Sequence, residues 1–146
     1  MTDGVESADL HYPSEEGGRV KGLIIDEPWI SLIVSGEKTW EMRSRNTGLR
    51  GRIGLIRKGS KTVIGLADLV DTLPKLPHSE LRASFAKHRV PEAEIDENFK
   101  WSTAWVLQRA RSLEQPVPYL HPAGAVIWVN LDPDVAAVIE QQVADG

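Results

Sequence analysis

The chain has 146 residues, a formal net charge of −4 and no cysteine. This length fits one small domain, and the lack of cysteine excludes disulfides, thiolate nucleophiles and cysteine zinc sites. The sequence has no run of 18 apolar residues and no basic-then-apolar leader, so we expect a cytoplasmic protein without membrane association.

Charge is distributed unevenly along the chain. Residues 1–18 hold five acidic residues and no lysine or arginine, and residues 132–146 hold four acidic residues and no basic one. Residues 36–61 hold eight basic and two acidic residues, a local charge of +6. We therefore predict an acidic disordered tail over 1–18, followed by one domain over 19–146 whose basic centre suits an anionic ligand.

The domain is predicted to begin with a strand over residues 20–25 and a short helix. Pro28 suits the first helical position, and Gly36 is typical of the residue that follows the last turn, so the helix should end at Ser35. Lys38 then lies at the junction between the helix and the next element.

The segment after Gly36 has the period of a strand. Polar and charged residues alternate there with Trp40 and Met42, which places the two kinds of side chain on opposite faces. The polar face carries Thr39, Glu41, Arg43 and Arg45. Such a charged row must be solvated, paired or bound to a ligand, because unpaired burial is costly.

Turn signals and periodicity predict the remaining elements. Strands are expected over 51–56, 63–71, 103–109 and 125–131. Helices are expected over 80–88 (with Ser79 as the cap), from about 91, and over 133–144, where Asp132-Pro133 forms the start signal. Prolines 116, 118 and 122 predict a loop. This order predicts an α+β fold, a small, partly open barrel of five to six strands with short flanking helices.

The spacing Gly36, Lys38, Glu41 and Arg43 resembles the signature Gly-x-Lys-x-x-Glu-x-Arg of the ASCH domain family, a branch of the PUA-like β-barrels. The resemblance extends over the expected strands from about Val20 to Leu131, in the family's order. It implies a PUA-like barrel that binds RNA or another nucleic acid in a cleft beside the sheet.

Lys38 and Glu41 are the candidate catalytic residues. Burial and a nearby Arg43 would lower the pKa of Lys38 and make it a base or nucleophile; alternatively, it pairs with Glu41 or a phosphate. Glu41 is either a proton shuttle or a structural partner. Arg43 either binds a phosphate or base edge through its planar fork or forms a buried ion pair with Glu41 or Asp68.

Further candidate ligand residues are basic or aromatic. Trp29, Trp101 and Trp105 are each either a stacking platform for a base or part of the core, whereas Trp40 and Trp128 are predicted in the core. The basic candidates are Arg45, Arg57 and Lys58, and backbone N–H groups near Ser60 could bind a phosphate. The four histidines lack metal-site spacing, and no phosphate loop or dinucleotide motif is present, so we expect no metal or other cofactor.

Two functions remain open from the sequence. The first is binding of RNA, a nucleotide or a nucleoside in a basic cleft. The second is a metal-independent hydrolase using Lys38, because the resemblance includes N4-acetylcytidine amidohydrolases and ribonucleases. The amidohydrolase type has Thr at the place of Glu41 and uses a later Glu, for which Glu80 or Glu97 is the candidate. The sequence specifies no oligomeric state.

Overall fold

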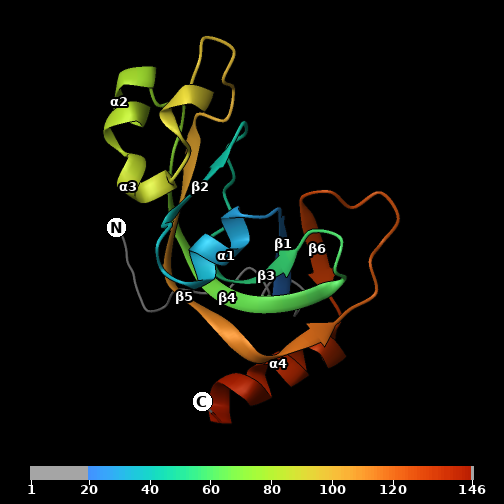
Figure 1. Cartoon of the computed structure of the whole chain (residues 1–146). Coiled ribbons are helices and arrows are strands. Elements are labelled where there is room, and N and C mark those ends of the chain that lie inside the picture. Colours follow the sequence, from blue (N-terminus) through green and yellow to red (C-terminus); the bar gives the residue numbers. More distant parts are fainter. Residues whose placement is uncertain (1–19, 146) are drawn as a thin grey trace.

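The computed structural model describes residues 20–145, so the tail expected over 1–18 lies outside the described residues. Its six strands form one mixed sheet in the order β2-β5-β4-β3-β1-β6 (Figure 1). The strands are β1 (Val20–Ile25), β2 (Trp40–Arg43), β3 (Gly51–Arg57), β4 (Thr62–Leu73), β5 (Thr103–Pro118) and β6 (Trp128–Leu131). Only β1 and β3 are parallel among these pairs, and the α+β fold predicted from the sequence is confirmed.

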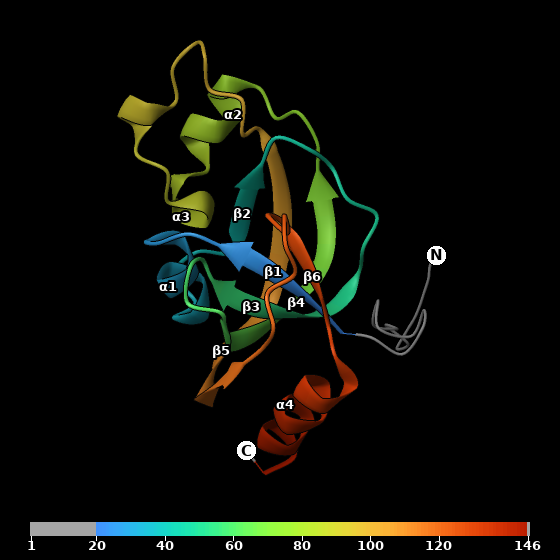
Figure 2. The same cartoon turned by 90° about the vertical axis from the view of Figure 1, so that its right-hand side faces the viewer.

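The short helices lie around the curled sheet (Figures 1 and 2). They are α1 (Trp29–Val34), α2 (His78–Ala83), α3 (Phe85–His88), the 3-10 turn η2 (Glu92–Glu94) and α4 (Pro133–Asp145). We call residues 78–95 the α2–α3 lobe; it lies beside β2, whereas α4 packs against β5 at the other end of the molecule. In the described part of the chain, no helix is both long and apolar enough to cross a membrane.

Strand β5 extends nine residues beyond the predicted end at Arg109 and reaches Pro118, so the predicted loop is wrong as far as Pro118 and correct around Pro122. The strand bends at register shifts in its pairing with β4 and at the left-handed backbone of Arg109 (φ 55°). Beyond Leu107 only β4 pairs with β5, because β2 pairs no further than Val106. This edge-like position tolerates the missing N–H groups of the prolines.

Strand β6 is shorter than predicted, because residues 125–127 belong to the β5–β6 loop. One backbone hydrogen bond from Ile24 to the carbonyl of Ile127 (2.9 Å) ties the end of this loop to β1. The loop therefore leaves the sheet beside the carboxyl end of β1, where the cavity described below opens.

The helix predicted over 80–88 is two helices, and Ser79 does not cap it; Pro77 precedes α2 instead. The break occurs at Ser84, where the carbonyl of Leu81 accepts hydrogen bonds from the Ser84 N–H (3.1 Å) and from the ring of His88 (2.5 Å). A continuous helix needs that carbonyl for the N–H four residues later, so the His88 contact replaces the helical bond.

Helix α1 has a side-chain acceptor at its start and a glycine with left-handed backbone after its end. The carboxylate of Glu27 accepts hydrogen bonds from the N–H (3.4 Å) and hydroxyl (2.7 Å) of Ser31, which provides an acceptor for one N–H group near the start of the helix. Gly36 adopts φ 87° and ends the helix as predicted. The chain then turns directly into β2, which places Lys38 at the inner side of the sheet edge.

The apolar core consists of three clusters. One lies between α1 and the sheet, the second lies under α4, and the third joins β2 to the α2–α3 lobe. Trp40 is buried in the third cluster, as predicted, whereas Trp128 is half-buried and stacks on Trp105 with ring centroids 5.8 Å apart. Trp29 packs against both the first and the third cluster, and the Lys38 ammonium lies 4.9 Å from the centre of its ring.

Candidate functional site

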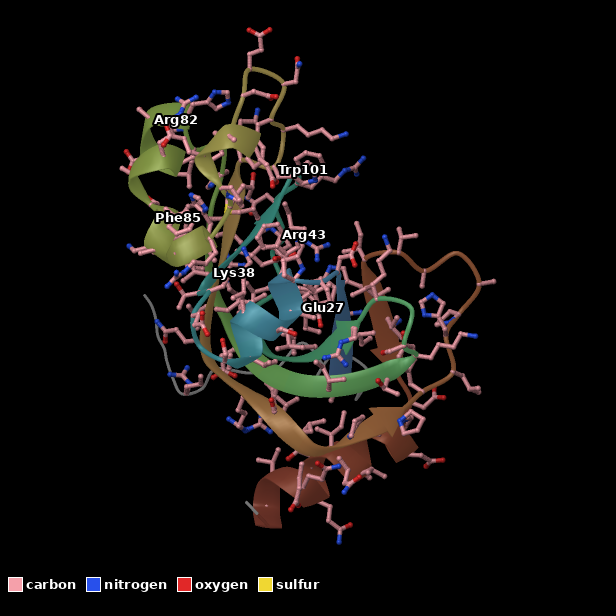
Figure 3. The ribbon with its side chains drawn as sticks, in the orientation of Figure 1. Glu27, Lys38, Arg43, Arg82, Phe85 and Trp101 are labelled. Carbon is pink, nitrogen blue, oxygen red and sulfur yellow. The ribbon has the colours of Figure 1, made fainter. Side chains whose placement is uncertain are left out.

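A cavity of about 760 Å³ lies beside the carboxyl end of β1 and against β2. Its floor comes from β2 and α1, and its walls come from the β3–β4 turn, the segment 90–101 and the β5–β6 loop. Of the predicted ligand residues, the structure brings Lys38, Glu41, Arg43, Trp29 and Lys58 together here with Trp101. Figure 3 shows Lys38 and Arg43 near β2 with Trp101 above them, and Arg82 and Phe85 on the outer side of the lobe.

Lys38 lies at the floor of the cavity and is only 2% exposed. Its ammonium donates a hydrogen bond to the backbone carbonyl of His88 (2.6 Å) and lies 4.9 Å from the centre of the Trp29 ring. Burial lowers the pKa of Lys38 from 10.5 to about 8; Glu41, 3.9 Å away, opposes this shift and Arg43 adds to it. The structure therefore holds an amine that loses its proton far more easily than a solvated lysine.

Glu41 and Arg43 form a largely buried ion pair on the same face of β2. The guanidinium donates from Nε to Oε2 of Glu41 (2.9 Å) and from Nη2 to the carbonyl of Ile24 (2.8 Å), and Nη2 also lies 2.8 Å from Oε2 of Glu41 as an ion pair. Arg43 additionally lies 5.5 Å from the centre of the Trp105 ring. The guanidinium of Arg43 is thus bonded to groups of the protein itself, while Oε1 of Glu41 faces Lys38.

The mouth of the cavity is more exposed than its floor. The β3–β4 turn contributes Lys58 and Lys61, both exposed, and the ammonium of Lys58 is 3.9 Å from the carboxylate of Asp26. On the opposite wall Trp101 is 46% exposed, and the ammonium of Lys100 lies 5.2 Å from its ring centre. An exposed indole with a neighbouring cation is suited to stacking on a base.

Four of the predicted ligand residues do not line the cavity. Arg57 donates to the carboxylate of Glu27 (2.9 Å), and the hydroxyl of Ser60 bonds to the backbone of its own turn. Trp105 is 3% exposed, and its indole N–H donates to the carbonyl of Arg45 (2.9 Å). Trp105 is therefore part of the core, which was the second alternative for it, and Arg45 is exposed and does not line the cavity.

The predicted basic cleft is nearly balanced in charge. Among the described residues it is lined by four basic side chains (Lys38, Arg43, Lys58, Lys61) and three acidic ones (Asp26, Glu41, Glu94), a sum of +1 compared with +6 for residues 36–61. Three of the other basic residues in this segment have partners elsewhere: Arg52 binds Glu140 (2.9 Å), Arg50 binds the hydroxyl of Thr72 (3.0 Å), and Arg57 binds Glu27. Charge that is contiguous in sequence is dispersed over several faces.

Several lining residues were not predicted. Glu94 lines the cavity, whereas Glu80 and Glu97 do not. Tyr119 and His121 line it from the β5–β6 loop; the Tyr119 hydroxyl and Nδ1 of His121 are 2.9 Å apart, and burial raises the pKa of Tyr119. The proline-rich composition predicted the loop in which His121 lies, but nothing local indicates that this loop folds against β1.

The chain was compared with protein-family models, curated sequences and solved structures. The ASCH domain family model matches residues 23–117. The structure is similar to the crystal structure of ASCH from Zymomonas mobilis (19% identity, 86% of this chain and 93% of that chain covered, TM-score 0.61). It is equally similar to a mutant of that protein (20% identity, 83% and 94% covered, TM-score 0.62). No curated protein sequence matches the chain. Because the family model covers well over half of the residues, this chain belongs to the ASCH domain family.

Proposed function

We propose that the protein binds a nucleotide, either free or as one unit of an RNA strand, and takes its base into the cavity beside β1. The observation that carries this proposal is that two indole rings, a buried amine and two exposed lysines all face one space of about 760 Å³. A cavity of this size accommodates a base and its sugar. Trp29 lies at the floor and Trp101 at the mouth, so a base can contact aromatic surface at both depths.

The floor offers a hydrogen-bond donor next to an acceptor. The ammonium of Lys38 and Oε1 of Glu41 are 3.9 Å apart. Every common base presents an acceptor beside an N–H donor on its Watson–Crick edge, so this pair suits a base edge without selecting one base by itself. Arg43 supports the arrangement, because it holds Glu41 through the other carboxylate oxygen.

The mouth suits a phosphate. Lys58 and Lys61 both lie on the β3–β4 turn and are exposed at the cavity entrance. With a base at the floor, a 5′-phosphate would lie near this turn, where two ammonium groups favour it. The low net charge of the cavity predicts a modest dependence of affinity on salt, since few phosphates are contacted.

The test is a titration of the protein with cytidine, the four ribonucleoside monophosphates and a short single-stranded RNA at low salt. We expect quenching of tryptophan fluorescence with saturable binding, tighter for the monophosphates than for cytidine. Trp101→Ala should weaken binding, while Trp128→Phe, which alters an indole outside the cavity, should not. No saturable binding of any of these ligands at low salt would refute the proposal.

A hydrolase that acts on an acylated nucleoside such as N4-acetylcytidine, or on RNA, is the second candidate. The lowered pKa of Lys38 favours it: with a pKa of about 8, roughly a tenth of the amine is unprotonated at neutral pH. That amine could serve as base or nucleophile, with Glu41 accepting a proton and Glu94 as a further carboxylate on the wall.

Incubation with N4-acetylcytidine and short RNAs, followed by mass spectrometry, tests the hydrolase. Lys38→Arg is the matched variant, because arginine keeps the positive charge but does not deprotonate. We expect Lys38→Arg to abolish turnover if the amine reacts. Turnover that survives in Lys38→Arg would exclude an activated lysine, and no product from the wild type would leave binding as the function.

A further inference from the structure

His88 is a fully buried titratable residue that the cavity does not use directly. It lies at the end of α3, in the α2–α3 lobe, and its backbone carbonyl is the acceptor for the Lys38 ammonium (2.6 Å). Its ring, in contrast, points into the lobe. The acceptor for the buried amine thus comes from a segment 50 residues further along the chain.

Both ring nitrogens of His88 are engaged by the backbone. Nδ1 accepts a hydrogen bond from the N–H of Val90 (2.9 Å), so the proton of the neutral ring resides on Nε2, which donates to the carbonyl of Leu81 (2.5 Å). Burial lowers the pKa of His88, the hydrogen bond to Leu81 opposes this shift, and the charge of Lys38 adds to it. The neutral form is the one that satisfies both contacts.

The two ring contacts determine where the His88 carbonyl points. The chain reverses directly after His88, since Arg89 adopts a left-handed conformation (φ 62°) and its N–H bonds to the carbonyl of Phe85 (2.8 Å). One ring therefore bridges α2, before this reversal, and Val90, after it. A peptide group held on both sides in this way cannot rotate its carbonyl away from Lys38 without breaking a buried hydrogen bond.

We propose that His88 is a positioning residue for Lys38: its neutral ring fixes the carbonyl that holds the Lys38 ammonium at the cavity floor. The relevance to ligand binding rests on the proposed function, because it assumes that Lys38 contacts the ligand. The groups that face the Lys38 amine are the His88 carbonyl from α3, Glu41 and Arg43 from β2, and the Trp29 ring from α1. Among these, only the carbonyl is within hydrogen-bonding distance.

The experiment measures the pKa of Lys38 in the ligand-free protein by NMR titration of its Cε–Hε signals, assigned by their loss in Lys38→Arg. His88→Phe retains the bulk of the ring but removes both contacts. His88→Asn retains an acceptor for the Val90 N–H and removes the donor to Leu81. Ile95→Val is the control. It removes one methylene group from the apolar cluster that contains Leu81 and Val90, and it leaves all of these hydrogen bonds in place.

We expect the pKa of Lys38 to rise from about 8 toward 10.5 in His88→Phe, since the released ammonium can turn toward Glu41 and water. The rise should be smaller in His88→Asn and absent in Ile95→Val. A pKa that stays near 8 or falls in both His88 variants, or that moves equally in Ile95→Val, would overturn the proposal.

A parallel titration with cytidine monophosphate separates this inference from the proposed function. If the wild type binds the nucleotide, His88→Phe should weaken binding, but by no more than Lys38→Met does. If the wild type does not bind it, the proposed function fails, whereas the pKa measurement on ligand-free protein still decides the role of His88. Equal affinity of the wild type and His88→Phe would count against the positioning role.

Discussion

The two halves of the basic segment 36–61 differ in how deeply their charged side chains are buried and in which groups they pair with. In the first half, Lys38, Glu41 and Arg43 are buried or nearly so, and each has a partner within the protein. In the second half, Arg52 and Arg57 pair with exposed carboxylates from distant segments, and Lys58 and Lys61 remain at the cavity mouth. One basic segment of the sequence thus produces a buried floor in its first half and mostly solvent-accessible cations in its second half.

This difference shows which charges affect stability and which affect binding. Buried ion pairs are poorly screened, so loss of one partner leaves an uncompensated charge. Exposed pairs such as Arg57–Glu27, in which both side chains are 42% exposed, contribute little because water and salt screen them. We therefore expect substitutions of the buried floor residues Lys38, Glu41 and Arg43 to change the free energy of unfolding, and substitutions at the mouth to change ligand affinity alone.

Glu41→Ala should have the largest effect. Arg43 would keep only the carbonyl of Ile24 as a hydrogen-bond partner, so we expect a loss of about 3 kcal/mol in the free energy of unfolding. Glu41→Gln should lose less, since its amide oxygen still accepts from the guanidinium. Urea denaturation measures both. A Glu41→Ala variant as stable as the wild type would show that the floor is not a buried pair in solution.

Lys38 should make stability depend on pH above neutrality. Its pKa is about 8 in the folded protein and near 10.5 in the unfolded chain, so between these values unfolding takes up a proton and rising pH stabilises the fold. Relative to Lys38→Met, the free energy of unfolding of the wild type should rise by about 1.4 kcal/mol per pH unit in that window. Below about pH 8 the amine is protonated in both the folded and the unfolded state, so Lys38 no longer makes the free energy of unfolding change with pH.

Denaturant titrations of both proteins across that pH range measure the difference, which cancels the titration of other lysines. A constant difference between the wild type and Lys38→Met from neutral pH to pH 10 would mean that Lys38 is solvated. That result would show that Lys38 at the cavity floor is as solvated as the lysines at the mouth.

Lys61→Ala and Lys58→Ala should each weaken binding of a nucleoside monophosphate about threefold, with no change in stability. Affinity for cytidine, which lacks the phosphate, should stay constant in both variants. Calorimetric titration of the two ligands provides the comparison. Equal losses for cytidine and its monophosphate would show that the β3–β4 turn shapes the cavity and does not contact phosphate.

Arg45→Ala should have the smallest effect. Arg45 is exposed, and only its backbone carbonyl has a structural role, as the acceptor for Trp105. We expect nucleotide affinity equal to that of the wild type and a free energy of unfolding within about 0.5 kcal/mol of it. A clear loss of RNA affinity in this variant alone would indicate that a strand continues outside the cavity along the end of β2.

Sequence periodicity predicted the elements that depend on neighbouring residues. The alternation after Gly36 correctly placed Glu41 and Arg43 on one face of a strand, and Gly36 correctly ended α1. The predictions failed where a distant contact overrides local preference. A histidine ring interrupts the helix expected over 80–88, and pairing with β4 carries β5 through two prolines.

The sequence by itself determined the α+β fold, the signature strand and the presence of an amine and a carboxylate near one another. The tertiary structure alone decided that Lys38 is buried against a carbonyl from α3, that Arg43 is engaged by Glu41, and that the β5–β6 loop forms a cavity wall. The physical reason is the distance along the chain over which each effect acts. Backbone conformation and side-chain direction depend on a few adjacent residues, whereas desolvation and charge pairing depend on every atom nearby in space, whatever its place in the chain.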